Sequence, residues 1–239
     1  MSPRPWLQAR HALVAAGLAL GLGWALTAGS TTRQGIDYEV RTHRIPLTAK
    51  VLGFLHRDAE YRLLAAQITA GLGSDQERAR ALFDWTRSAV RATPRGWPVI
   101  DDHILHLIIR GYGSGDQMAD VLTTLATYAG LPAFWSPGPV AVSFVQVDGR
   151  WTVWDVANNR VFADPEGRLY DVRELMDRPE LIQAAAGAPS DDYADLVRGF
   201  RVPPVLRARQ QMPLPRLGYE LRRLILGAAG PGSRMRRLP

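Results

Sequence analysis

The 239-residue chain contains no cysteine. Disulfides, zinc sites built on thiolates and cysteine nucleophiles are therefore excluded. Lysine is almost absent, because Lys50 is the single lysine and arginine supplies the remaining positive charge. Histidine is absent after residue 106. The five histidines are His11, His43, His56, His103 and His106.

Acidic residues are scarce at the C-terminal end. Residues 201–239 hold nine arginines and one acid, Glu220, and so have a formal charge of +8. The formal net charge of the whole chain is +6, so residues 1–200 carry −2. We attribute the arginine bias to the base composition of a GC-rich genome. No helix-turn-helix or zinc-finger pattern accompanies it, so we expect no nucleic-acid partner.

An uncharged run extends from Ala12 to Thr31, behind Arg4 and Arg10. At ~1.5 Å per residue it is about long enough to cross a bilayer. We predict that residues 1–31 form a transmembrane helix that acts as a signal anchor, and a cleaved signal peptide is the alternative. Either interpretation places the domain outside the cytoplasm. As an anchor, the segment would make a single-pass inner-membrane protein that faces the periplasm.

Helical patterns follow a segment, 32–56, that we interpret as a linker. One predicted helix opens with a capping box made by Ser74 and Glu77. Another is buried and ends before Gly130, with apolar residues at helical spacing. The predicted helices span 58–71, 74–93, 101–111 and 116–129.

The period changes after residue 138. Three segments alternate or run apolar, as strands do, and Asp148-Gly149 and Asn158-Asn159 lie between them as hairpin turns. Helices followed by an antiparallel sheet indicate an α+β fold, with the helices packed on the sheet. The predicted strands span 139–147, 150–156 and 160–172, and a further helix is expected at 172–186.

We predict one domain over 57–195 and a basic C-terminal tail over 196–239. The tail contains an amphipathic helix with Leu217, Leu221 and Leu224 on one face and arginines elsewhere. Such a helix could lie on an anionic membrane surface or pack against protein.

The segments "GYGSGDQMADVLTTLATYAGLPA" (111–133) and "DGRW" (148–151), in this order of elements, resemble the transglutaminase-like superfamily, a branch of the papain-like fold. The resemblance covers roughly residues 75–175. It implies a papain-like α+β fold with a buried helix facing a sheet. Members of the family catalyse acyl transfer or proteolysis with a cysteine, a histidine and an aspartate.

The resemblance maps those three positions to Gly115, Val140 and Asp155. Glycine has no side chain to attack with, and valine cannot exchange a proton. A shift of two residues around Val140 supplies no histidine. We therefore predict a pseudoenzyme with no cofactor and no metal. It would keep the cleft as a binding or scaffold surface in the bacterial cell envelope, where the resemblance suggests polysaccharide or envelope biogenesis.

The candidate binding residues lie around the start of the buried helix and on the strands that face it. Ser114 and Asp116 are also typical helix caps. Of the tryptophans, Trp151 is expected in the core, whereas Trp135 could serve either the core or a ligand. We expect a protein or glycan partner. The candidates are Ser114, Asp116, Gln117, Trp135 and Asp155.

Two alternatives remain open. The chain could be an active hydrolase or acyltransferase that uses Ser114 as its nucleophile, or a metal held by His103 and His106 one helical turn apart. It could instead be a structural subunit of a membrane complex, with the N-terminal helix and the basic tail as contacts.

Overall fold

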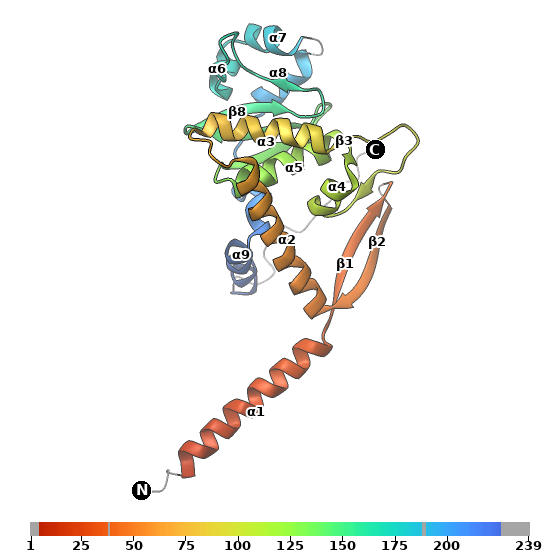
Figure 1. The fold of residues 1–239 in the computed structure, drawn as a ribbon, viewed down its shortest axis with the longest axis vertical. Helices are drawn as coiled ribbons and strands as arrows, with labels where there is room; N and C mark the ends of the chain where they lie inside the picture. Colours follow the sequence, from red (N-terminus) through yellow and green to blue (C-terminus); the bar gives the residue numbers. More distant parts are fainter. Residues whose placement is uncertain (1–4, 38, 188–189, 226–239) are drawn as a thin grey trace. The chain divides into compact units, whose positions relative to one another are not determined.

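The computed structural model describes residues 5–37, 39–187 and 190–225 (Figure 1). The chain divides into two compact units. The smaller unit comprises Met1–His56 and Ile100–Asp102, and the larger unit comprises Arg57–Val99 and His103–Pro239.

The smaller unit contains a helix and a three-stranded antiparallel sheet in which β1 is central. Most side chains of the β1–β2 hairpin are exposed, so no apolar alternation marks these strands in the sequence. The segment 32–56 is thus made of strands and the start of a helix rather than irregular chain, and its role as a linker stays a prediction. The elements are α1 (Pro5–Thr27), β1 (Gly29–Ile36), β2 (Glu39–Pro46) and β4 (Ile100–Asp101).

Among the described residues, no helix is both long and apolar enough to cross a membrane. The predicted span ended at Thr31, but α1 ends at Thr27 and strand β1 begins at Gly29. The structure therefore does not support the predicted transmembrane helix, and the periplasmic location stays a prediction.

The larger unit begins with helices and a short parallel pair of strands. Helix α4 ends at Gly111, whose positive φ of 75° forms the left-handed C-cap that glycine adopts without strain. The elements are the second part of α2 (Leu47–Ile68), α3 (Asp75–Ala89), β3 (Arg91–Ala92), α4 (Ile104–Arg110), β5 (Tyr112–Gly113) and α5 (Gly115–Tyr128).

A four-stranded antiparallel sheet follows, in the order β6-β7-β8-β9. Asp148 and Gly149 join β7 to β8, and both have positive φ, 49° and 77°, as a type I′ hairpin turn requires. This confirms the predicted turn. The strands are β6 (Ala133–Ser136), β7 (Val142–Val147), β8 (Arg150–Asp155) and β9 (Arg160–Val161).

Helices cover both faces of this sheet. In Figure 1, α3 and α5 lie on one side of β8, and α6 (Val172–Asp177), α7 (Glu180–Ala186) and α8 (Ser190–Arg198) lie on the other. Successive strand residues point to opposite faces. Val145 and Trp154 therefore join the core beneath α3 and α5, whereas Phe144 and Val153 join a second core beneath α6–α8. The predicted α+β class, with helices on an antiparallel sheet, is confirmed.

Proline divides the helix predicted over 172–186. Arg178 has φ −133° and ψ 71°, which is outside the helical region, and it precedes Pro179. The proline ring disfavours a helical conformation for the residue before it. Two short helices, α6 and α7, therefore replace one, and they turn to cover the second core.

The start of α3 is fixed by the predicted capping box. The Glu77 carboxylate accepts hydrogen bonds from the Ser74 amide (3.0 Å) and the Ser74 hydroxyl (2.9 Å), and the Glu77 amide donates to the Ser74 hydroxyl oxygen (3.2 Å). These bonds, first of all that from the Ser74 backbone, lower the pKa of Glu77.

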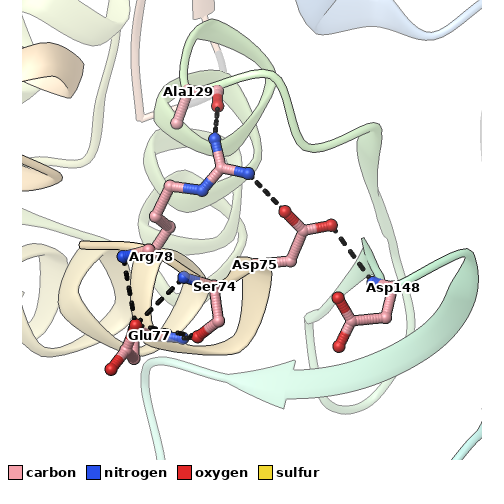
Figure 2. A network of polar contacts seen from close by, with 7 residues as sticks. Ser74, Asp75, Glu77, Arg78, Ala129 and Asp148 are labelled. Atoms are coloured by element: carbon pink, nitrogen blue, oxygen red, sulfur yellow. Dashed lines mark hydrogen bonds and ion pairs between the residues drawn. The ribbon is translucent and has the colours of Figure 1, made fainter.

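Asp75 connects this helix start to two distant parts of the larger unit (Figure 2). Its carboxylate accepts a hydrogen bond from the Asp148 amide in the hairpin turn (3.2 Å) and one from Arg78. Arg78 also donates to the carbonyl oxygen of Ala129 at the end of α5 (3.1 Å). The network therefore ties α3 to both the hairpin and α5.

The C-terminal end of α5 also contacts α2 and a segment near the end of the described chain. The Tyr128 hydroxyl lies 2.8 Å from the Asp58 carboxylate of α2 and 3.0 Å from the Gln211 carbonyl oxygen. Burial, and then the bond to Asp58, raise the pKa of Tyr128. Gln211 closes the 3-10 helix η1 (Arg207–Gln211), which precedes α9 (Pro213–Ile225).

Candidate functional site

The site begins at the N-terminus of α5, where Ser114 is the N-cap. The Ser114 amide donates to the side-chain oxygen of Gln117 at 3.1 Å, and the Ser114 hydroxyl donates to the Asp116 carboxylate. Asp116 is exposed, whereas Gln117 is buried. The polar side chains around the helix start thus bond to one another, as capping residues do.

Gly115 occupies the position that the resemblance assigns to a nucleophile. A Cβ placed on this residue would lie 3.3 Å from the Cβ of Ala157, which belongs to the turn after β8. This is closer than ordinary van der Waals contact between two carbon atoms. The space in front of the helix start is therefore partly taken by the turn, and glycine fits it without displacing Ala157.

Asp155, at the end of β8, is fully buried and well supplied with hydrogen-bond donors. Its carboxylate accepts from the Tyr193 hydroxyl at 2.6 Å, from the Asn158 amide at 2.9 Å and from the Asn158 side chain at 2.8 Å. A buried carboxylate is costly unless it is bonded in this way. Asp155 therefore serves to join β8, the following turn and α8.

Tyr193 is the partner that the sequence analysis did not identify. It comes from α8, 38 residues beyond Asp155, and its hydroxyl also accepts a hydrogen bond from Arg160 at 3.3 Å. Burial, followed by the bond to Asp155, raises the pKa of Tyr193 to about 12. No local sequence signal marks this contact, because the two residues meet only through the packing of α8 on the sheet.

Val140 occupies the position that the resemblance assigns to the histidine. It lies two residues before β7, is partly buried and packs against the second core. Its neighbours Ala141 and Val142 are also apolar. The residues that lead into β7 therefore pack against the core and offer no group that can take up a proton.

A hollow of about 310 Å³ lies beside the start of α5. Gly115, Asp116 and Trp135 line it, together with 137–139 and Ala141. A neighbouring, more apolar hollow of about 290 Å³ includes Trp135, Phe134 and Val205 in its walls. Trp135 thus belongs to both hollows. The structure brings Asp116 and Trp135 together there, whereas Ser114, Gln117 and Asp155 line neither hollow.

The indole of Trp135 has an unusual feature. Its Nε1 is shielded from solvent and has no hydrogen-bond acceptor among the residues that the structure describes. An unsatisfied buried donor costs about 1–3 kcal/mol. By contrast, Trp154 in the core donates to the Thr152 hydroxyl at 2.8 Å. Trp151 is partly buried and packs against Phe134 and Phe200.

The two histidines considered for a metal lie around the start of α4. His103 is its N-cap and His106 follows in the first turn, with ring centroids 5.8 Å apart. Within the described part of the chain, no three histidine, aspartate or glutamate side chains gather closely enough to hold a metal ion. A metal on these histidines would therefore need ligands from elsewhere.

No family model matches the chain, and no curated protein matches it. Two solved structures are weakly similar to it. One is a candidate protease from Parabacteroides distasonis, with 15% identity, a TM-score of 0.33 and coverage of 53% of this chain and 35% of that protein. The other is a candidate cysteine protease from Cytophaga hutchinsonii, with 14% identity, a TM-score of 0.38 and coverage of 56% of each chain. The chain thus spans about half or less of their length, and likenesses this weak assign it no activity.

Proposed function

We propose that the chain is a non-catalytic member of the papain-like fold, of the transglutaminase-like type, and that it binds a partner at the hollows around Trp135. One observation carries the proposal. The start of α5 has Gly115, which offers no nucleophile, and the carboxylate of Asp155 already accepts hydrogen bonds from Tyr193 and Asn158.

The chemistry of the site supports this proposal in two steps. Acyl transfer of the family's type needs a nucleophile and a base that exchanges a proton with it. Gly115 and Val140 offer neither, and Tyr193 and Asn158 take up the carboxylate of Asp155. Burial holds the Tyr193 phenol protonated, so it is a donor to Asp155 rather than a base.

Ser114 is the strongest competing nucleophile, because its hydroxyl donates to Asp116. Asp116 is exposed to solvent, however, and a carboxylate in that setting is a weak base towards a hydroxyl. The same contacts serve as the cap of α5. We therefore favour a structural role for this pair.

Trp135 supports the binding half of the proposal. The ring of Trp135 lines both hollows, and such a ring suits a ligand that presents an apolar or sugar face. Both a glycan and a peptide can present such a face. We propose that the partner is a protein or glycan of the cell envelope, in line with the expected export of the domain.

A turnover assay tests the absence of catalysis. The purified full chain, incubated with fluorogenic amide and ester substrates, should release product no faster than the same solution with the Ser114→Ala variant. Product release by the parent chain that the Ser114→Ala variant loses would overturn the proposal in favour of a serine hydrolase.

Crosslinking tests the binding site. A photoreactive amino acid at position 114, beside the hollow, should give a discrete adduct in the cell envelope, and the same residue at exposed Ser88 on α3 should not. Trp135→Ala removes the ring that lines both hollows, and should reduce the yield at position 114. Equal adducts from positions 114 and 88, with folded protein in both cases, would contradict the assignment of the site.

A further inference from the structure

Helix α9 carries an exposed apolar stripe formed by Leu214, Leu217 and Leu221. Their exposed fractions are 80%, 55% and 47%. At about 100° per residue, the three side chains fall within about 60° of one another around the helix axis. Scattered single leucines on a surface are ordinary, but three in one row on an amphipathic helix indicate a contact surface.

Exposed arginines lie on the same helix and on the segment next to it. Arg222 lies on α9 itself, and Arg207 and Arg209 lie on η1, which packs against α9. All three are exposed. Over residues 201–225 the sequence has six arginines and one acid, Glu220, which pairs with Arg216 at 2.7 Å.

The charge decides among the surfaces that could cover the stripe. A second copy of the chain would bring two arginine-rich segments together with few acids to offset them, and this repulsion disfavours self-association. An anionic surface meets the same arginines favourably. The stripe is purely aliphatic, and long arginine side chains can extend from such a helix to headgroups while the leucines enter the acyl boundary.

We propose that α9 and η1 form an interfacial docking surface for anionic lipid. The leucine stripe would enter the outer part of the acyl region, and the flanking arginines would contact the lipid phosphates. This contact lies in the plane of the membrane surface and needs no spanning helix. The leucine stripe lines neither of the hollows at Trp135, although Arg207 of η1 also lines the more apolar one.

The absence of cysteine permits a local test in the full chain. Leu217→Cys, labelled with an environment-sensitive fluorophore, should shift to the blue on vesicles that contain phosphatidylglycerol, and should remain unchanged on phosphatidylcholine alone. Ser88→Cys, on the exposed side of α3, is the matched control and should not respond. Added in the Leu217→Cys background, Arg222→Gln should weaken the apparent affinity about fivefold, as expected for one arginine at an anionic surface.

Three results would overturn the proposal. The first is sedimentation of the chain with the vesicles while the label at 217 stays unchanged, because another part would then carry the contact. The second is an equal shift on both lipids that Arg222→Gln leaves unaltered. The third is a shift without vesicles that grows with protein concentration, which would indicate self-association through the stripe.

Discussion

The contact between Tyr193 and Asp155 provides the sharpest test of the site's structural role. Tyr193→Phe removes the 2.6 Å hydrogen bond to a carboxylate that is 0% exposed, together with the longer bond of 3.3 Å that the hydroxyl accepts from Arg160. The side-chain volume changes little. A hydrogen bond to a charged group contributes about 1.5–3 kcal/mol. Asn158 retains its two bonds to the carboxylate, so we expect a loss of about 2 kcal/mol in the free energy of unfolding, within that range.

Urea denaturation of the full chain, followed by circular dichroism, measures this loss. In a thermal scan, the same change should lower the melting temperature by about 4–8 °C for a domain of this size. Tyr219→Phe is the matched control, because Tyr219 is 41% exposed on α9 and should change stability little.

The pH dependence gives an independent readout. The pKa of Tyr193 is raised to about 12 in the folded protein, above the ordinary value of about 10 that the unfolded chain should have. The folded state thus holds the phenol proton more tightly. Its contribution to stability is complete below pH ~10 and is lost as the pH rises through about 12. Tyr193→Phe should lack this component.

Equal unfolding midpoints for Tyr193→Phe and Tyr219→Phe, together with identical pH profiles for Tyr193→Phe and the parent chain, would refute the reasoning. Asp155 would then be held by Asn158 alone. Its availability for proton transfer would have to be considered again.

Three further predictions concern the start of α5 and the network around α3. Gly115→Cys should give a thiol that iodoacetamide alkylates, as seen by mass spectrometry, but no amide hydrolysis, because Val140 supplies no base; hydrolysis by this variant would contradict that. Asp75→Ala should lose about 1 kcal/mol in urea denaturation, since it breaks the link to the hairpin turn and to Arg78, while Asp84→Ala, which breaks an exposed ion pair, should lose less. Glu77 has a lowered pKa, so its stabilisation should be present above its ordinary pKa of 4.5 and lost as the pH falls through the lower folded value; a Glu77→Gln variant with the parent's acid profile would refute this.

Two elements mark the limits of prediction from the sequence. The β1–β2 hairpin buries few side chains, so it has no apolar alternation to detect, and the sequence suggests a linker there. The length of an uncharged run predicts a membrane span, but the helix within that run ends at Thr27 and a strand begins two residues later. Length and polarity alone did not reveal where the helix ends.

The candidate site shows the same division. Ser114, Asp116 and Trp135 could be selected from the sequence, and the structure brings Asp116 and Trp135 to one hollow. Gln117 is buried, and its side-chain oxygen accepts a hydrogen bond from the Ser114 amide. A glutamine three residues after an N-cap serine is compatible with this bond but does not require it. The unsatisfied N–H of Trp135 could not be predicted, because it depends on which acceptors the fold leaves within reach.

Features that depend on composition, or on residues a few positions apart, are predictable from the amino-acid order alone. The capping box of α3, the Asp148-Gly149 turn and the absence of any thiol are of this kind, because local backbone preferences and residue identity decide them. The hydrogen bond from Tyr193 to Asp155 and the close approach of Ala157 to Gly115 depend instead on how the elements pack. Those contacts join residues 38 and 42 positions apart, and they exist because both faces of the sheet must be covered by helices before its apolar side chains are buried.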